Sequence, residues 1–518
     1  MRIRTLLLAL CVATASAAGT PPDKRPTPQA PLRLILHDPT GSTCPMTTCD
    51  TAFCTSLLEL IQKAERTIDF AVYGFRGQPA IVDALVQAKA RGVVIRGVVD
   101  RTVDGKNYYS DTERVIELLG DVRDDLAADK RTLALQKPYD PSKSMCWMDA
   151  PIGYFGPKQC VGYDLGDSCI VAVHTTQEEL NFQGEIMHDK YFVVDGTYVW
   201  MGSTNVSDSC SGGYNANLVG VLNSPVVAGW YAHEFEQMWS GVHHKEKSSA
   251  RPMRAQLTSD LSVDAYFSPV DDPMNDAVRP LLQGARERID VAIFFLTHKG
   301  IAGDLIAAHR RGVKVRVLID STGASNGYSK HELLRAVGIP VKIEDWGGKM
   351  HMKAAAVDNE FVIMGSMNWT SAGENGNDEN TLIVHSKAHA QQFHAFFEDL
   401  WPQVSDKWLS GRPDPESLNS RASCTDDVDN DYDHLTDAED PGCGPNPPAL
   451  EPPLPYRIVP KMEGQGLLKG NVTESGARTY HVPGGQWYDE VQINPSEGDA
   501  WFCSDEEAKR AGFRRSSR

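Results

Sequence analysis

Long hydrophobic runs, an excess of positive charge and Cys-x-x-Cys pairs are all missing from this sequence. No apolar stretch reaches the ~18–20 residues that a membrane-spanning helix requires, which argues against a polytopic membrane protein. The net charge of −18 argues against a protein that binds nucleic acid mainly by surrounding its backbone with cations. The absence of any Cys-x-x-Cys pair makes a thiolate zinc site a weak prediction. The 518 residues, 41% of them hydrophobic, instead indicate a globular chain of about three or four structural units.

The first residues have the layout of an export signal. Two arginines precede an apolar stretch, which is followed by the small residues Ala15, Ser16 and Ala17. We therefore expect a signal peptide over residues 1–17 and a secreted or extracytoplasmic protein of bacterial export; a buried apolar N-terminal helix is the alternative. Of 11 cysteines, all but Cys11 remain after cleavage, and this even number is compatible with disulfides, although spacing does not give their pairing.

The chain contains an internal repeat. AERTIDFAVYGF, which begins at Ala64, matches ARERIDVAIFFL, which begins at Ala285. ARGVVIRGVVD, which ends at Asp100, likewise matches RRGVKVRVLID, which ends at Asp320. Each copy reads as helix, apolar strand, amphipathic helix and second apolar strand, which is typical of helices layered on a largely parallel sheet. The sequence therefore predicts an α/β protein with two related α/β/α halves, residues 33–245 and 255–405, built on mixed, largely parallel sheets.

A second pair of matching segments carries polar residues suited to chemistry. MHDKYFVVDGTYVWMGSTN, from Met187, and MHMKAAAVDNEFVIMGSMN, from Met350, both spell His-x-Lys, four residues, Asp, six residues, Gly-Ser-x-Asn. The numbering offset between the copies is smaller here than in the repeat, so the first half has an insertion between the repeat and its motif. This insertion, within about residues 101–180, is cysteine-rich. It is a candidate lid or substrate rim, or a plain surface excursion.

Strand geometry is expected to bring the motif residues of each half together. In an extended strand, residues i and i+2 point to the same side, so the His and Lys share a face. Each Asp stands in a tight hairpin turn, which favours a structural or orienting role over direct chemistry, and the returning strand brings Ser and Asn back toward the His and Lys. The candidate residues are His188, Lys190, Asp195, Ser203 and Asn205 in the first half and His351, Lys353, Asp358, Ser366 and Asn368 in the second.

Two such patches facing each other can cleave a phosphodiester. One imidazole can attack phosphorus and hold it covalently, while the other protonates the leaving alkoxide and later activates water. The ammonium groups, with Ser and Asn, can bind the phosphate oxygens. Neither copy has the carboxylates that a two-metal phosphodiesterase needs, so no cofactor is expected for catalysis. Two extended patterns with identical spacing rarely arise by chance, which makes a purely structural explanation the weaker one.

These motifs resemble the paired His-Lys-Asp signatures of the phospholipase D superfamily, and the resemblance covers about residues 33–405. It implies a pseudo-twofold α/β/α enzyme with its site at the interface of the halves, a phosphohistidine intermediate, and one monomer as sufficient for one active site. From FLTHKGIAGDLIAAHRRGVKVRVLID to NWTSAGENGNDENTLIV, the second half is most similar to the nuclease and cardiolipin-hydrolase branch.

A carboxylate downstream of the motif distinguishes the two halves. In the branch just named, such a carboxylate fixes the His ring. Glu379 matches it in position after His351 and is expected to be the partner of that histidine, whereas the same spacing counted from His188 leads to Ala216. A nearby carboxylate raises the pKa of an imidazole. We therefore expect His351 to be the proton donor and His188 to be the nucleophile.

The chain becomes rich in Pro, Asp and Gly after about residue 411. Residues 421–445 resemble the Asp-rich calcium repeats of secreted bacterial proteins, with His434 in place of the usual Gly; a solvated acidic linker is the alternative. Cys424 and Cys443 bracket this loop and are suited to a disulfide. The calcium candidates are Asp429, Asp431, Asp433, Asp437 and Asp440.

Two further segments lie outside the motifs. Residues 466–515 resemble a small extracellular module of the sunset type, which suggests tethering or binding. His243-His244 is interpreted as a solvated helix end.

Three functions are compatible with this sequence: a secreted phospholipase-D-type hydrolase of phospholipid head groups that contacts a membrane surface, a secreted metal-independent endonuclease, and an inactive surface-binding protein. The intact His, Lys and Asn of both copies argue against the third. Both substrates are phosphodiesters, so the motif does not distinguish the first two. Acidic charge and the lack of a long basic run favour lipid, whereas the nuclease-like second half and the last module favour nucleic acid.

Overall fold

The computed structural model describes residues 30–135, 158–164, 168–175, 185–326 and 329–447, and shorter segments between 457 and 516. The expected signal peptide, residues 1–17, and much of the insertion, including Cys146, lie outside the described residues. Within the described part of the chain, no helix combines the length and the apolar character needed to cross a membrane.

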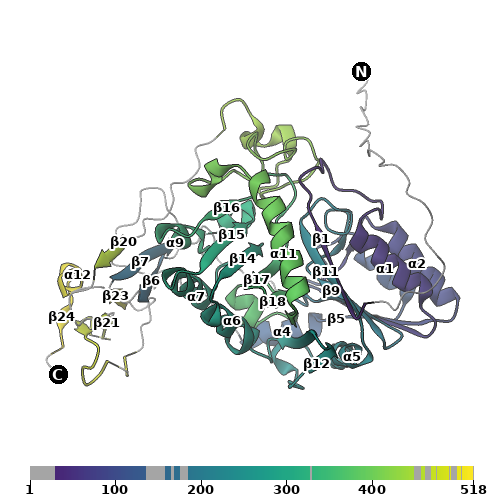
Figure 1. The fold of residues 1–518 in the computed structure, drawn as a ribbon, viewed down its shortest axis with the longest axis horizontal. Helices are drawn as coiled ribbons and strands as arrows, with labels where there is room; N and C mark the ends of the chain where they lie inside the picture. The colour runs from purple at the N-terminus through teal and green to yellow at the C-terminus, as the bar shows by residue number, and fades with distance from the viewer. Residues whose placement is uncertain are drawn as a thin grey trace.

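The first half is a seven-stranded sheet with helices on both faces (Figure 1). Its strands occur in the order β1 (Leu32–His37), β11 (Asn217–Asn223), β9 (Tyr198–Gly202), β8 (Lys190–Val194), β2 (Thr67–Val72), β4 (Val94–Val99) and β5 (Val122–Asp124). The apolar faces of α1 (Ala52–Lys63) and α2 (Pro79–Ala90) share one core with Ile68 and Phe70 of β2. Ala71, on the opposite face of β2, packs in a second core, which explains why the strand is apolar throughout.

The second half repeats this arrangement in an eight-stranded sheet. Its order is β12 (Arg254–Thr258), β13 (Leu261–Ser268), β19 (Glu379–His385), β18 (Phe361–Gly365), β17 (Lys353–Val357), β14 (Arg288–Ile293), β15 (Lys314–Ile319) and β16 (Val341–Ile343). Its outer helices include α6 (Arg279–Gly284), α7 (Lys299–Arg310) and α9 (His331–Ala336).

The prediction of two related α/β halves with mixed sheets is confirmed, but the sheets are not largely parallel. Only the β2-β4-β5 and β14-β15-β16 sets pair in parallel; the other neighbours within these two sheets are antiparallel. The physical reason lies in the motif itself. β8 and β9, like β17 and β18, are joined by a short turn, and such a turn can connect only antiparallel strands.

The two halves meet through a continuous apolar core. Helices α5 (Pro225–Trp239) and α11 (Lys387–Leu400) lie in this interface, and α11 runs through the middle of Figure 1. Tyr231 of α5 and Phe393 of α11 belong to the same buried cluster as Phe267 of β13. Because one core serves both sheets, the relative position of the halves is fixed by packing.

The C-terminal region contains two structural parts. The Asp-rich segment has short 3-10 turns at Asp437–Glu439 and Pro441–Cys443, and Cys424 is disulfide-bonded to Cys443, which confirms that bridge. The last part is a small sheet around a core that includes Leu468, Tyr480, Phe502 and Phe513. Its elements are β21 (Leu468–Val472), β22 (Arg478–His481), β23 (Ala500–Phe502), α12 (Asp505–Arg510) and β24 (Arg514–Arg515). Its resemblance to a sunset module stays a prediction.

An Asp in each motif turn ties the hairpin to the strand beside it. Asp195 has a φ of 52°, and its carboxylate accepts hydrogen bonds from the backbone N–H groups of Glu65 (3.0 Å), Arg66 (2.7 Å) and Thr67 (3.0 Å). Asp358, with a φ of 50°, does the same for residues 286–288. Although burial opposes ionisation of Asp195, these backbone donors hold its pKa below the ordinary value.

Replacing Asp195 with Ala is therefore expected to lower the free energy of unfolding by about 1 kcal/mol, since three backbone donors lose a charged acceptor at a partly solvated site. Urea denaturation checks this. A depressed carboxyl pKa stabilises the fold above the unfolded pKa, so the difference from wild type should shrink as pH falls below about 4. Asp195→Asn, which retains an acceptor and tolerates positive φ, is the matched control and should lose less.

Candidate functional site

The two motif histidines stand just before equivalent strands, and each is followed by a buried lysine. Lys190 Nζ donates to the His188 carbonyl and Lys353 Nζ donates to the His351 carbonyl, both at 2.7 Å. His188 and His351 are 9% and 7% exposed, so they are nearly enclosed. All four groups interact electrostatically, since both lysines disfavour the charged form of each histidine. The two motifs therefore converge as predicted, and their two histidines and two lysines form one shared cluster.

Backbone pairing between the halves produces this convergence. The His188 N–H donates to the Asp378 carbonyl at 2.9 Å, and the His351 N–H donates to the Ala216 carbonyl at 3.0 Å. Isolated parallel bridges pair Met187 with Asp378 and Ala216 with Met350. The backbone of each histidine is therefore held by the residue just before a strand of the opposite half. That strand is β19 for the first motif and β11 for the second.

Glu379 belongs to His188, not to His351 as its sequence position suggested. Its Oε1 and Oε2 both lie 2.8 Å from His188 Nδ1. Burial raises the pKa of Glu379 to about 8, although Lys190 opposes this. Burial, Lys190 and Lys353 together hold the pKa of His188 well below its ordinary value. These contacts fix the ring of His188. When Glu379 is ionised, the proton between the two side chains lies on Nδ1, so that His188 is a neutral, oriented imidazole.

Asn217 takes the equivalent place beside His351. Ser203 N–H donates to Leu218 O, as Ser366 N–H donates to Asn380 O, so Asn217 corresponds to Glu379. The sequence comparison led to Ala216 because it applied the spacing between His351 and Glu379 to His188. The first half is one residue longer between its histidine and Asn217. The expectation that His188 lacks a carboxylate and His351 has one is therefore wrong.

The partner of His351 is a neutral amide with a defined orientation. Asn217 Oδ1 lies 3.2 Å from His351 Nδ1 and accepts from Ser203 Oγ at 2.8 Å, while Asn217 Nδ2 donates to Asn215 O at 3.3 Å. Buried, unbridged Cys210 places its Sγ 3.8 Å from the same Nδ1. Since Asn217 Oδ1 can only accept here, Nδ1 carries the proton of neutral His351. Burial, Lys353 and Lys190 hold the pKa of His351 well below its ordinary value.

Burial disfavours the charged form of both motif lysines. Burial lowers the pKa of Lys190 to about 8, and burial together with Lys190 lowers that of Lys353 well below its ordinary value. An anionic phosphate placed between the two ammonium groups would relieve this by direct charge pairing. The cluster is therefore suited to bind and polarise a phosphodiester.

The Ser and Asn residues that follow the motifs divide into two roles. Ser203 Oγ is engaged with Asn217, and Ser366 Oγ is hydrogen-bonded to Glu379 and to the Asn380 N–H. These hydroxyls orient the partners of the histidines and are not free for phosphate, which corrects the prediction for Ser203 and Ser366. Asn205 Oδ1 and Asn368 Oδ1 are buried without a hydrogen-bond partner among the described residues. Because a carbonyl oxygen only accepts, it is the Nδ2 groups of these two amides that remain candidates for contact with a phosphate.

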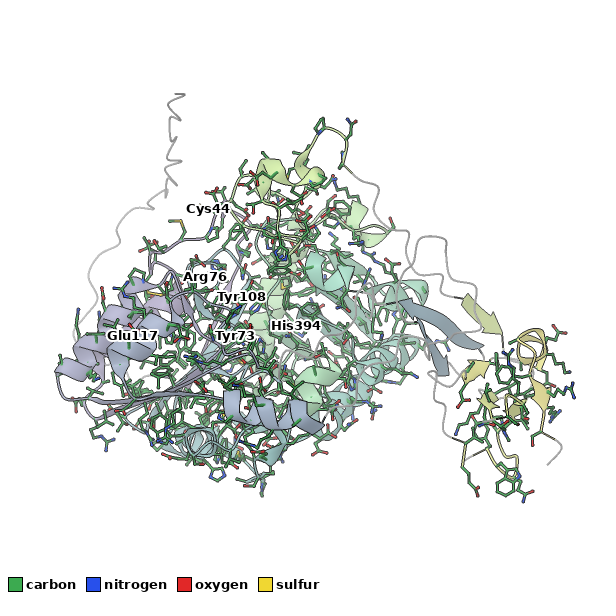
Figure 2. All side chains as sticks on the ribbon, turned by 180° about the vertical axis from the view of Figure 1, so that it is seen from behind. Cys44, Tyr73, Arg76, Tyr108, Glu117 and His394 are labelled. Atoms are coloured by element: carbon green, nitrogen blue, oxygen red, sulfur yellow. A yellow bond between two sulfur atoms is a disulfide. The ribbon has the colours of Figure 1, made fainter. Side chains whose placement is uncertain are left out.

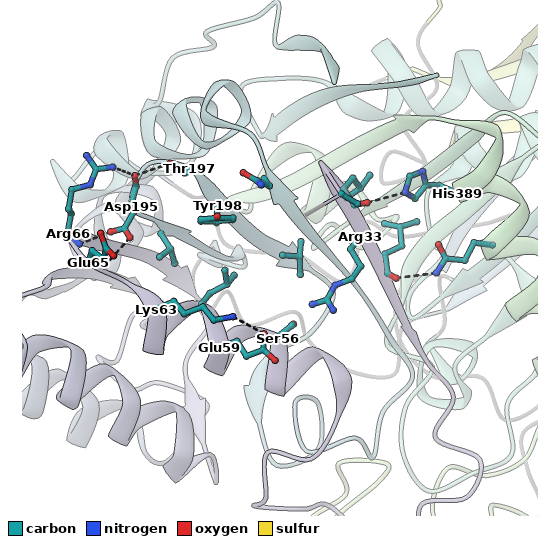
Figure 3. A pocket seen from close by; sticks show the side chains of 18 residues that line it. Arg33, Ser56, Glu59, Lys63, Glu65, Arg66, Asp195, Thr197, Tyr198 and His389 are labelled. Atoms are coloured by element: carbon teal, nitrogen blue, oxygen red, sulfur yellow. Dashed lines mark hydrogen bonds and ion pairs between the residues drawn. The ribbon is translucent and has the colours of Figure 1, made fainter. Parts of the chain in front are cut away.

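Asp195 and Asp358 stand outside the cluster, which corrects their inclusion among the catalytic candidates. Each lies at the turn that ends β8 or β17, whereas the Lys lies at the start of that strand. Asp195 lines a groove of about 710 Å³ together with Arg66 and Tyr198. Figure 3 shows it hydrogen-bonded to the residues that lead into β2. Neither motif histidine lines this groove. Both Asp residues position the hairpins and do not touch the reacting groups.

A buried ionic network behind the site escaped sequence reasoning. Asp378 accepts from the His244 backbone N–H at 2.8 Å, and its carboxylate lies 2.8 Å from Lys247 Nζ and 3.2 Å from His244 Nδ1. Although burial opposes it, Lys247 and His244 hold the pKa of Asp378 well below its ordinary value. His243 and His244 are 1% and 2% exposed, so the interpretation as a solvated helix end is wrong. No motif spacing signals this network, because it joins both halves.

The Asp-rich segment gathers most, but not all, of its expected ligands. Asp431, Asp433 and Asp440 place carboxylate oxygens within 4.8 Å of one another, and Glu416, Asp429 and Asp431 form a second such group. The Asp437 carboxylate instead accepts from the backbone N–H groups of Asp426 and Asp427, both at 3.1 Å. Asp437 is thus not in either group. Glu416 was missed because it precedes the Asp-rich segment, residues 421–445.

Comparisons with known proteins identify the family. A family model described as "Cardiolipin synthase, PLD-like domain" covers residues 57–239 and 278–401, more than half of the chain. The chain belongs to this family. It is therefore a phosphodiesterase-type hydrolase of the phospholipase D superfamily, whose hydrolases need no metal for catalysis.

Individual relatives cover parts of the chain. A mitochondrial cardiolipin hydrolase of Xenopus laevis is 29% identical over 180 residues, 32% of this chain and 85% of that protein. A phospholipase D of Rickettsia felis is 37% identical over 110 residues, 21% of this chain and 54% of that protein. The solved structure of Nuc, a phospholipase D family member from Salmonella typhimurium, is 30% identical and covers 28% of this chain and 97% of that one, with a TM-score of 0.26.

The amide beside His351 gives a pH prediction. Asn217→Asp places a carboxylate on Nδ1, which favours the imidazolium and should raise the pKa of His351 by about one unit or more. A proton donor works below its pKa, so the alkaline limb of kcat/KM for phosphodiester hydrolysis should move to higher pH. Asn223→Asp, at the far end of β11, adds the same charge away from the site and should leave the profile unchanged. An unmoved limb in Asn217→Asp would exclude His351 as the group that titrates there.

Proposed function

We propose that the protein hydrolyses the head-group phosphodiester of phospholipids through a covalent phosphohistidine on His188. The observation that carries this proposal is the 2.8 Å contact between Glu379 and His188 Nδ1. A carboxylate on Nδ1 fixes the tautomer and leaves the Nε2 lone pair as the nucleophile. The assignment agrees with the expectation from sequence, but for the opposite reason: His188 is the histidine that has the carboxylate.

The reaction then follows in two balanced steps. His188 Nε2 forms a bond to phosphorus while the bond from phosphorus to the head-group oxygen breaks, and His351, protonated when the anionic substrate is bound, gives its Nε2 proton to that oxygen. Water next attacks phosphorus, its proton returns to His351 Nε2, and the P–N electron pair returns to His188. Lys190 and Lys353, with the Asn205 and Asn368 amides, stabilise the phosphate oxygens in both steps.

Lipid is favoured over nucleic acid as the substrate. Relatives matched by the chain are named cardiolipin hydrolase and phospholipase D. The net charge of −18 also disfavours a long polyanion. An endonuclease using the same site remains the second candidate, supported by the resemblance of the second half to the nuclease and cardiolipin-hydrolase branch. The two differ in substrate and not in mechanism.

Location and the tail extend the proposal. We propose export of the protein, which the arrangement of residues 1–17 and the Cys49–Cys54 and Cys424–Cys443 disulfides support. One chain contains both histidines, so a monomer is sufficient, and head-group hydrolysis would bring it to a membrane surface. The carboxylates around Asp431 are proposed to hold calcium, with a structural role away from the reaction.

Trapping the intermediate tests the roles of the two histidines. His188→Ala and His351→Ala should each reduce turnover by several orders of magnitude, because nucleophile and acid serve one reaction. With a substrate whose leaving group needs no proton, His351→Asn should accumulate phosphorus on His188, which mass spectrometry of the quenched protein detects. Glu379→Gln should slow formation of this adduct by about 10–100-fold. Phosphorus on His351 would reverse the assignment.

Substrate class and metal independence are tested together. In EDTA, the protein should hydrolyse phosphatidylcholine vesicles and leave plasmid DNA uncut. If DNA is cut and lipid is not, the nuclease is the correct function. Loss of both activities, restored by zinc or magnesium to a protein that stayed folded, would contradict the metal-free mechanism. Asp431→Asn is a suitable control for any effect of EDTA that acts through calcium. Removing the tail near Pro413 is not suitable, because residues beyond that point contact the segment before His351.

A further inference from the structure

Three buried carboxylates and one imidazole gather beside Met187, the residue before the first motif histidine. Asp125, which follows β5, Asp129 of α4 (Leu126–Leu135) and His244 place possible ligand atoms within 4.8 Å of one another. These three residues are 0%, 1% and 2% exposed. Asp100 adjoins them, because Asp100 Oδ1 and Asp125 Oδ2 both accept from the Met187 N–H at 3.0 Å. The cluster is therefore enclosed and lies directly next to the catalytic motif.

The imidazole of His244 is oriented as a metal ligand would be. Its Nε2 lies 3.3 Å from Asp129 Oδ1 and 3.8 Å from Asp125 Oδ2. Tetrahedral zinc ligands at about 2.0–2.2 Å from the ion lie about 3.3–3.6 Å from one another, which is close to this spacing. The Asp378 carboxylate lies 3.2 Å from Nδ1, on the other side of the ring. A carboxylate on one ring nitrogen commonly directs the other toward a metal, which then replaces the proton there.

Hydrogen bonds leave part of this cluster unsatisfied. Asp129 Oδ1 accepts from the Glu185 N–H at 3.0 Å, but Asp129 Oδ2 is buried without a hydrogen-bond partner among the described residues. In the same part of the chain, His244 Nε2 also has no partner with hydrogen-bond geometry, although the carboxylates are close. Buried polar atoms are nearly always paired. A cation between the imidazole and the carboxylates would satisfy these atoms together.

The second half has a lysine where the first half has none. Asp320 is the counterpart of Asp100 in the repeat; burial raises the pKa of Asp320, and the positive charge of Lys349 opposes this. Lys349 stands two residues before its motif histidine, and Ile186 occupies that position in the first half. Among the described residues, His244 is the only basic side chain that forms ion pairs with the three carboxylates of the cluster. A cation from solution can supply the missing positive charge.

We propose that His244, Asp125 and Asp129 bind a zinc ion, with Asp100 beside them as the fourth ligand, and that this ion fixes the backbone ahead of His188. Zinc suits a site that combines an imidazole with carboxylates, whereas calcium and magnesium prefer oxygen ligands alone. The ion has a structural role. Its ligands are none of the groups that act on phosphate, so the proposed reaction still uses no metal, and the site does not depend on whether the substrate is lipid or nucleic acid.

The metal content of the full-length protein tests this. Zinc is added in the presence of excess calcium, which competes for the Asp-rich segment, and unbound metal is removed by gel filtration. Wild type should keep about one zinc ion per chain, measured by inductively coupled plasma mass spectrometry. His244→Gln and Asp129→Asn each remove a ligand and should weaken zinc binding by at least about 10-fold. X-ray absorption of the zinc-loaded wild type should show an imidazole, with nitrogen and oxygen ligands at about 2.0–2.2 Å and no sulfur.

A buried histidine elsewhere in the fold supplies the matched control. His394 of α11, labelled in Figure 2, is 5% exposed, and its Nδ1 lies 2.7 Å from Asp290 Oδ2. Its Nε2 donates to the Asp358 carbonyl at 2.6 Å, so this ring lacks a second carboxylate on its other nitrogen. His394→Gln also removes a buried histidine–aspartate contact, but it should keep the zinc.

Three results would overturn the proposal. Wild type that retains no zinc would mean that protons shared among the carboxylates balance their charge. Zinc retained equally by wild type, His244→Gln and Asp129→Asn would place the ion elsewhere, and so would a sulfur ligand in the absorption spectrum. If the two variants do not fold, the zinc content and the absorption spectrum of wild type still decide.

Discussion

The site depends on backbone hydrogen bonds in which each half binds the start of the other half's motif. Two backbone bonds, from His188 to Asp378 and from His351 to Ala216, cross the interface in opposite directions. They place each imidazole against a side chain of the other half, and they do so only because a common apolar core holds both sheets in register. Neither half by itself contains a histidine with its partner. The reactive centre is therefore a property of the interface.

This arrangement buries several charged groups, which is unfavourable, and ionic partners near the site offset part of that penalty. Lys190 and Lys353 are almost fully enclosed, and burial alone lowers their tendency to stay charged. Glu379 lies close by, and Asp378 is neutralised by Lys247 and His244. A buried charge without a partner would be strongly destabilising, so the chain supplies partners from both halves. Each of the two ammonium groups donates to a backbone carbonyl, but neither forms a salt bridge with a described residue, and an anionic substrate would supply that missing charge.

The pseudo-symmetry is broken where the chemistry needs two different groups. Glu379 and Asn217 occupy equivalent positions, yet one is an acid and the other an amide. In the proposed mechanism, the carboxylate fixes the nucleophile, whereas the amide leaves the opposite imidazole free to gain and lose a proton as substrate binds. The tail breaks the symmetry again, because Asn430 contacts Gly347 and Lys349 in the segment that leads into the second motif.

Local sequence was enough for the elements and for the histidines and lysines of the site. The strand period, the turns at Asp195 and Asp358 and the repeated spacing follow from short-range chemistry, and the structure shows the same hairpins. Sequence could not assign Glu379 to His188, because a one-residue difference in spacing hid its equivalence to Asn217 and because hydrogen bonds between halves leave no periodic signal. It could not bury His244 or bring Asn430 against Gly347 and Lys349 for the same reason. Contacts between distant segments are decided by how the sheets and the tail pack, and only the tertiary structure contains that information.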